Sequence, residues 1–174
     1  MSEKLPSKKE CIKILEKAGC HENVIKHSLA VEELAKRIAK KSKADIKLVS
    51  VAALLHDIGR AKTHGIKHAV EGAKIARKLG LPDEVVLIIE RHIGGGITKK
   101  EAKELGLPDK EYMPKTLEEK IVAHADNLIQ ECEKKPVKIV VKRFEEFGYK
   151  GVAKKILILH TDLSEICGMD VDLI

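Results

Sequence analysis

The sequence has 174 residues, of which 44% are hydrophobic and 34% charged, and its net charge is +6. That length suits one ordinary domain that buries most of its apolar surface. With no Trp, two Phe and two Tyr, the core must be aliphatic, and the composition argues against the aromatic stacking platforms of single-strand nucleic-acid binders. Because the lysines are interleaved with glutamates along the chain, we favour a solvated surface over a nucleic-acid-binding face.

The cysteines and the N-terminal residues indicate the cellular compartment in which we expect the protein. No C-x-x-C pair occurs among the four cysteines, which favours free thiols in a reducing environment. The N-terminus lacks an apolar signal core, and no apolar run approaches membrane-spanning length. We therefore expect a cytoplasmic protein with no membrane segment, and the composition is compatible with a monomer or a homo-oligomer.

Capping residues and glycines predict helices along most of the chain. Ser7 and Glu10 form a capping box that opens a first helix, and Gly19 ends it. Asp45 caps a third helix over 46–58, apolar around most of its circumference and therefore central, which Gly59 ends. Further helices are expected at 22–41, 67–79, 82–92, 98–106, 116–130, 136–148 and 151–166.

Two more capping boxes support the later helices, Thr98 with Glu101 and Thr116 with Glu119. The stretch 137–141 is β-branched and compatible with a strand. Its helical spacing, between a proline and a glycine, favours a helix instead. The sequence therefore predicts an all-α helical bundle over 1–174, in a single domain with no substantial sheet.

Four polar residues occupy positions that the helical pattern assigns to the interior. His27 falls on the apolar stripe of the second helix, and His56 and Asp57 end the most apolar helix of the chain. Asp126 lies on the buried side of the helix over 116–130. Burying a carboxylate is costly unless it is paired or coordinates a metal. Singly, each residue is better explained as a hydrogen-bonded core histidine or a helix cap, but the four together favour a divalent-metal site.

The order His27, His56-Asp57, Asp126 resembles the H…HD…D signature of the HD superfamily of metal-dependent phosphohydrolases, and residues 56–59 match the HDIG tetrapeptide of one subgroup. The resemblance covers roughly 23–130. It implies that these four residues bind a divalent transition metal (Mn, Fe, Ni, Co or Zn) with positions open for water and substrate. The metal-binding core would span about 22–131, with C-terminal helices at about 136–168 packing on it.

The same resemblance suggests a second ion. Histidines in places comparable to His68 and His92 complete a binuclear centre in HDIG and HD-GYP relatives, where the HD aspartate bridges both ions. Here Ile93 stands where a further histidine is expected and the GYP tripeptide is absent, which argues against a cyclic-di-nucleotide phosphodiesterase. One or two ions per chain are therefore expected. The alternative is that His68 is a surface residue at a helix start and His92 interacts with the C-terminal carbonyls of its helix.

Three cations flank the expected ligands and are candidates for binding substrate phosphate, with solvated surface charge as the alternative: Arg60, Lys62 and Arg91. His64 and His124 are candidates for hydrogen-bonding a ligand. His64 is equally well explained as a surface residue, and His124 points roughly opposite to Asp126 on its helix. His160 has no evident companion and is expected to be ordinary.

The function that the resemblance implies is hydrolysis of a phosphate ester by metal-activated water, on a nucleotide or another small phosphorylated molecule. Two alternatives remain open. A di-iron HD-type oxygenase would need His68 and His92 and would consume oxygen with iron. A non-catalytic nucleotide- or RNA-binding module is favoured by the pI near 9.0 and disfavoured by the complete ligand set.

Overall fold

The computed structural model describes residues 5–174, and the all-α fold class is confirmed. The helices in this range are α1 (Lys8–Ala18), α2 (Glu22–Ser42), α3 (Ile46–Leu55), α4 (His68–Lys78), α5 (Asp83–Glu90), α6 (Lys99–Glu104), α7 (Leu117–Leu128), α8 (Val137–Glu146) and α9 (Lys150–Cys167). Short 3₁₀ helices η1 (Ile58–Ala61) and η2 (Val171–Leu173) and an antiparallel pair, β1 (Ile129–Gln130) and β2 (Glu133–Lys134), complete the described elements.

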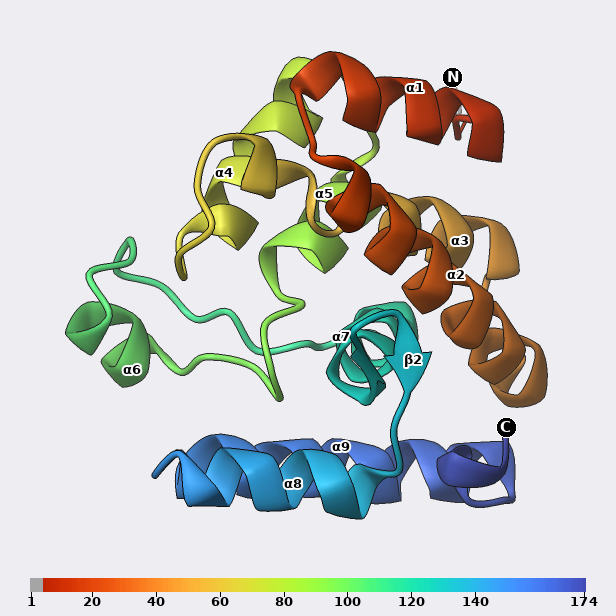
Figure 1. The fold of residues 1–174 in the computed structure, drawn as a ribbon, viewed down its shortest axis with the longest axis vertical. Coiled ribbons are helices and arrows are strands. Elements are labelled where there is room, and N and C mark those ends of the chain that lie inside the picture. The colour runs from red at the N-terminus through yellow and green to blue at the C-terminus, as the bar shows by residue number, and fades with distance from the viewer. Residues whose placement is uncertain (1–4) are drawn as a thin grey trace.

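Helix α7 lies between two groups of helices. Figure 1 shows α1 to α5 above it, the antiparallel pair α8 and α9 along the base, and α6 at one side. Helix α2 packs against α3 and α7, and α7 also contacts α5, α8 and α9. Fully buried leucine, isoleucine, valine and alanine side chains fill the space between the helices, as the shortage of aromatic residues requires. Within 5–174, no helix combines the length and the hydropathy needed to cross a membrane.

Most helix boundaries follow the capping residues. The boxes begun by Ser7 and Thr98 form with both reciprocal hydrogen bonds. The third box is half formed: the side chain of Thr116 accepts from the Glu119 N–H, but the Glu119 carboxylate turns to Arg91, whose Nη1 lies 2.9 and 3.0 Å from its two oxygens. Its Oε2 also accepts from the Lys115 N–H at 2.6 Å, so the carboxylate pairs with the guanidinium and with the N–H one residue before the cap.

The expected end of α3 at residue 58 is wrong. The α-helix ends at Leu55, and Asp57, with φ −98° and ψ 12°, lies in the sparsely populated bridge region before η1 begins. Gly59 is inside η1 rather than a helix stop. A Cβ there would lie 2.5 Å from the Gly72 nitrogen and 2.8 Å from the His68 carbonyl carbon, and nearer still to the His68 oxygen. The glycine therefore lets the backbone of α4 lie directly against η1.

Two other helices are shorter than expected. Helix α5 ends at Glu90 instead of residue 92, and α7 ends at Leu128 instead of residue 130. After α7 the chain forms a hairpin whose two turn residues, Glu131 and Cys132, both have positive φ, 51° and 64°. Two-residue hairpin turns favour this conformation because it matches the twist of the strands. Residues 137–141 are helical, as the spacing predicts.

A polar network runs from the buried His124 and His160 to the exposed Asp170 near the C-terminus, and it corrects two expectations. His124 Nε2 lies 2.9 Å from His160 Nδ1, and His160 Nε2 lies 3.0 Å from Asp170 Oδ1. The Asp172 carboxylate accepts from the Val137 N–H at the start of α8. His160 is therefore not without companions. The ring of His124 contacts this network instead of a candidate metal ligand.

Candidate metal centre

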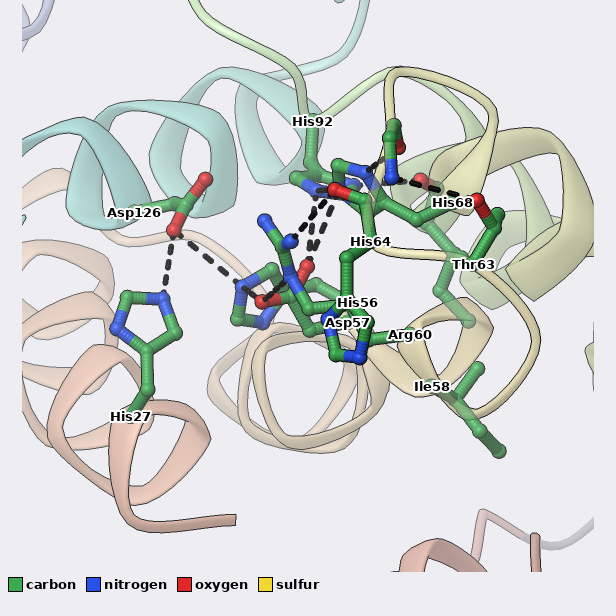
Figure 2. A network of polar contacts seen from close by, with 12 residues as sticks. His27, His56, Asp57, Ile58, Arg60, Thr63, His64, His68, His92 and Asp126 are labelled. Atoms are coloured by element: carbon green, nitrogen blue, oxygen red, sulfur yellow. Dashed lines mark hydrogen bonds and ion pairs between the residues drawn. The ribbon is translucent and has the colours of Figure 1, made fainter. Parts of the chain in front are cut away.

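The fold brings the six candidate ligands together from separate elements. They come from α2 (His27), the turn after α3 (His56 and Asp57), the start of α4 (His68), the turn after α5 (His92) and α7 (Asp126). Figure 2 shows their side chains pointing toward one another. Because α3 ends at Leu55, the chain turns at His56 and Asp57, and both consecutive side chains can face the cluster. Gly59 then brings α4, and with it His68, against that turn.

The first part of the cluster joins α2, α3 and α7. His27 Nε2 lies 2.8 Å from Asp126 Oδ1, and His56 Nε2 lies 3.3 Å from the same oxygen. His56 Nε2 is also 3.6 Å from Asp57 Oδ2. His56 and Asp57 are buried, whereas His27 and Asp126 are each 22% exposed, so this part of the cluster is open to solvent on one side.

The second part lies on the opposite oxygen of Asp57. Asp57 Oδ1 is 3.2 Å from His68 Nε2 and 3.6 Å from His92 Nε2, and the two histidine nitrogens are 3.1 Å apart. Ligand atoms of Asp57, His68 and His92 lie close enough together to hold one ion, and so do those of His27, His56 and Asp57 and those of His56, His92 and Asp126. Asp57 belongs to the first two groups, and its Oδ1 faces His68 and His92 while its Oδ2 faces His56. This is the arrangement that a bridging carboxylate requires.

Backbone carbonyls fix the orientation of three of the histidines. The Nδ1 atoms of His56, His68 and His92 lie 2.7, 2.9 and 2.7 Å from the carbonyl oxygens of the residues three positions earlier. A carbonyl can only accept, so each Nδ1 carries a hydrogen, and in the neutral ring Nε2 presents a lone pair to the cluster. Metal-binding histidines are held in the same way, by donating their other ring nitrogen to a carbonyl or carboxylate.

The unsatisfied atoms and the charges also fit a cation. Of the buried side-chain atoms in the described part of the chain, His56 Nε2 and Asp57 Oδ1 are among the few without a hydrogen-bond partner. Burial opposes the charged form of His56, yet Asp57 and Asp126 raise its pKa to about 9. Burial likewise opposes the charged carboxylates, but the surrounding histidines lower the pKa of Asp57 and of Asp126. The two charged carboxylates thus favour a proton on His56, at the place where a divalent ion would bind in its stead.

A pocket of about 520 Å³, which we call the metal pocket, opens onto the cluster. His68, His92 and Asp126 line it, together with Arg60. Arg60 Nε donates to Asp57 Oδ2 at 2.6 Å, and its Nη1 lies 3.3 Å from the His64 carbonyl oxygen (Figure 2). Of the three candidate phosphate-binding cations, Arg60 is therefore the one that the structure places beside the cluster.

The remaining candidates lie elsewhere or at the edge. Lys62 is exposed and Arg91 is held by Glu119, and neither lines the metal pocket. His64 is exposed and lines a second depression next to the cluster, shared with His27, Asp57 and Arg60. Five further residues line the metal pocket and are not predicted from the sequence, because only the folded chain brings β1 and the end of α8 to this place: Gln130, Arg143, Phe144, Phe147 and Tyr149.

The fold and this cluster define the class of protein. The HD domain family matches residues 24–131. This range includes all six candidate ligands: His27, His56, Asp57, His68, His92 and Asp126. The chain belongs to the HD domain family, as the resemblance implies.

Three known proteins are similar to the chain. A tRNA (cytidine(56)-2′-O)-methyltransferase of Thermoplasma volcanium is 47% identical over 168 residues, which are 97% of this chain and 50% of that protein. The chain therefore spans about half the length of this relative. An uncharacterised protein of Methanocaldococcus jannaschii is 50% identical over 154 residues, 84% of this chain and 91% of its own length. The HD domain of the Listeria monocytogenes phosphodiesterase PgpH shares the fold, with a TM-score of 0.55, 22% identity, and coverage of 93% of this chain and 97% of that domain.

Proposed function

We propose that the chain is a metal-dependent phosphohydrolase that cleaves a phosphate ester on a nucleotide or another small phosphorylated molecule. One observation carries the proposal: Asp57 presents one oxygen to His56 and the other to His68 and His92. An ion-pair network that served only stability would not need three imidazole Nε2 atoms directed at one carboxylate. A site for one or two divalent ions does.

Each side chain has a part in this proposal. His27, His56, Asp57 and Asp126 would hold the first ion, and His68 and His92 the second, with Asp57 bridging. Bound ions supply an activated water at neutral pH and polarise a phosphoryl oxygen. Arg60, which donates to Asp57 Oδ2, would turn its guanidinium to the substrate phosphate once cations neutralise that carboxylate.

A nucleotide is the favoured substrate because the relatives of this domain are associated with nucleotides and RNA. The Thermoplasma relative is named for the methylation of tRNA, and the PgpH domain has been solved in complex with cyclic-di-AMP. The same names, with the net charge of +6, support a second candidate, an RNA-binding module without turnover. That candidate predicts salt-dependent retention of tRNA by metal-free and metal-loaded protein alike.

The test measures hydrolysis and metal content in the same preparations. Protein loaded with Mn²⁺ or Fe²⁺ is assayed for phosphate release from nucleoside mono- and diphosphates and for cleavage of cyclic nucleotides. Asp57→Asn is expected to lose bound metal and turnover, while the matched control Asp109→Asn, at an exposed carboxylate 3.5 Å from Lys99 Nζ, keeps both. Turnover that survives both chelation and Asp57→Asn would contradict the proposal.

A further inference from the structure

The few aromatic residues of the chain are gathered at one place. The sequence contains two Phe and two Tyr and no Trp. Three of these four, Phe144, Phe147 and Tyr149, line the metal pocket. They lie on the last turns of α8 and in the turn that leads to α9, at the end of the helix pair along the base of the molecule (Figure 1).

Core packing does not account for this placement. Val137 and Val140, on the same face of α8, are buried, and Phe144 is half-buried. Phe147, at the end of the stripe, is 67% exposed, and Tyr149 is 59% exposed. Aromatic rings stabilise a fold through the large area that they bury, and these two leave most of that area in water. The apolar stripe of α8 thus begins in the core and ends as an open wall of the metal pocket.

The same pocket also has polar and cationic residues in its lining. Arg143 and Arg60 both line it, and Arg143 Nη1 donates to Gln130 Oε1 at 2.8 Å, which holds the guanidinium against β1. A neighbouring depression of about 480 Å³ shares Phe144 and Tyr149 and is otherwise lined largely by aliphatic side chains. The metal pocket therefore combines metal ligands and Arg60 with flat apolar rings, and Arg143 lies one helical turn from Phe147.

We propose that Phe147 and Tyr149 are a base-stacking wall, and that the molecule bound in the metal pocket is a nucleoside phosphate whose base lies on these rings. The inference deepens the proposed function, because it places the phosphate at the His–Asp cluster. Aromatic side chains stack on any base, since every base has a π-face, so the wall selects nucleosides over other phosphorylated molecules without selecting one base. Arg143 lines the same pocket one helical turn from Phe147 and would bind the phosphate or the sugar of such a ligand.

The experiment measures binding, so that it does not depend on turnover. Adenosine 5′-monophosphate and ribose 5-phosphate, which share the phosphate and the sugar, are titrated into Mn²⁺-loaded protein by calorimetry. Saturation-transfer NMR on metal-free protein identifies the ligand protons in contact. We expect the nucleotide to bind on the order of 10-fold more tightly than the sugar phosphate, with the strongest saturation on its base protons. Phosphate release in the same samples reports separately whether the proposed hydrolysis occurs.

Two variants assign the effect to the wall. Phe147→Ala should remove most of the preference for the nucleotide, and Phe147→Tyr should retain it. Ile139→Ala, an equally apolar truncation at a 53% exposed position on the same helix, does not alter the metal pocket and should leave the preference unchanged. Equal affinity for the two ligands in the wild type, or a preference that survives Phe147→Ala, would overturn the proposal.

Two further measurements test whether a second copy of the chain covers the rings, and whether the bound nucleoside is a free nucleotide or the end of an RNA strand. If sedimentation shows that Phe147→Ala converts a dimer into a monomer without changing the binding preference, the wall is an interface between copies and the proposal fails. A hexa-adenylate RNA that binds through the same wall, more tightly than the mononucleotide, identifies the end of a strand as the ligand. Tighter binding of the mononucleotide identifies a free nucleotide, and both results support stacking.

Discussion

Replacing Gly59 with alanine places a methyl group against the backbone of α4. The new Cβ would lie 2.5 Å from the Gly72 nitrogen and nearer still to the His68 carbonyl oxygen, whereas ordinary contact begins at 3.4 Å, so α4 must retreat by more than about 1 Å. Overpacking of this kind costs up to about 3 kcal/mol, because a helix backbone cannot turn aside as a flexible side chain can. For a chain of this size that corresponds to a fall in Tm of roughly 6–12 °C.

The same retreat should weaken the site selectively. Helix α4 carries His68, whose Nε2 lies 3.2 Å from Asp57 Oδ1, while His27 and Asp126 lie on α2 and α7. Gly59→Ala should therefore lose affinity for the second ion before the first, on the order of 10-fold or more. Denaturant unfolding and metal analysis measure both effects. Gly151→Ala is the control, since its Cβ would meet nothing within 4 Å and alanine favours the helix. A wild-type midpoint and full metal content in Gly59→Ala would refute this reasoning.

Two further predictions concern groups away from the site. The Glu32 carboxylate is 1% exposed and lies 2.8 Å from Lys8 Nζ; burial opposes its charge, but hydrogen bonds from Lys8, Ser50 and Lys36 lower its pKa below 4.5. Glu32→Gln should therefore lower the free energy of unfolding by about 2 kcal/mol at pH 7. In urea titrations, this difference from the wild type should become smaller as the pH falls below 4.5, because the wild-type carboxylate is then protonated. A difference that does not change with pH would contradict this. Burial raises the pKa of the Cys11 thiol to about 11, whereas Cys132 is exposed in the hairpin, so at pH 8 iodoacetamide should modify Cys132 first and leave Cys11 unmodified until unfolding. Mass spectrometry of the digested protein reads this order, and early alkylation of Cys11 would show that the surrounding core opens readily.

Local sequence signals predict where the helices lie better than they predict where each helix ends. Ser7, Thr98 and Gly19 act over a few residues, and all three behave as the sequence indicates. Glu119 leaves its capping box because Arg91, distant in sequence, offers a stronger partner in the folded chain. The end of α3 was misplaced at Gly59 because that glycine is required by contact with α4, and no local pattern shows such a contact.

The candidate site shows the same division. Polar residues at interior helix positions, with the order of the HD signature, predicted the residues that the fold gathers around Asp57. The pairing of His124 with His160 went unpredicted because the two residues meet only when α9 packs on α7. The low aromatic content argues against a stacking platform, and the proposed wall rests instead on the place that α8 gives Phe147 and Tyr149, which composition does not record.

The most direct test of the account is the number of ions that the chain binds. Protein purified without chelators or affinity metals is saturated with Mn²⁺ or Fe²⁺, freed of excess ion and analysed for metal per chain. Two ions should bind, one should remain in both His68→Ala and His92→Ala, and Asp57→Ala should retain little of either, with helical circular dichroism unchanged in all of them. A wild-type stoichiometry that stays at one ion under saturating metal would contradict the bridging role of Asp57, and undiminished metal in Asp57→Ala would remove the site altogether.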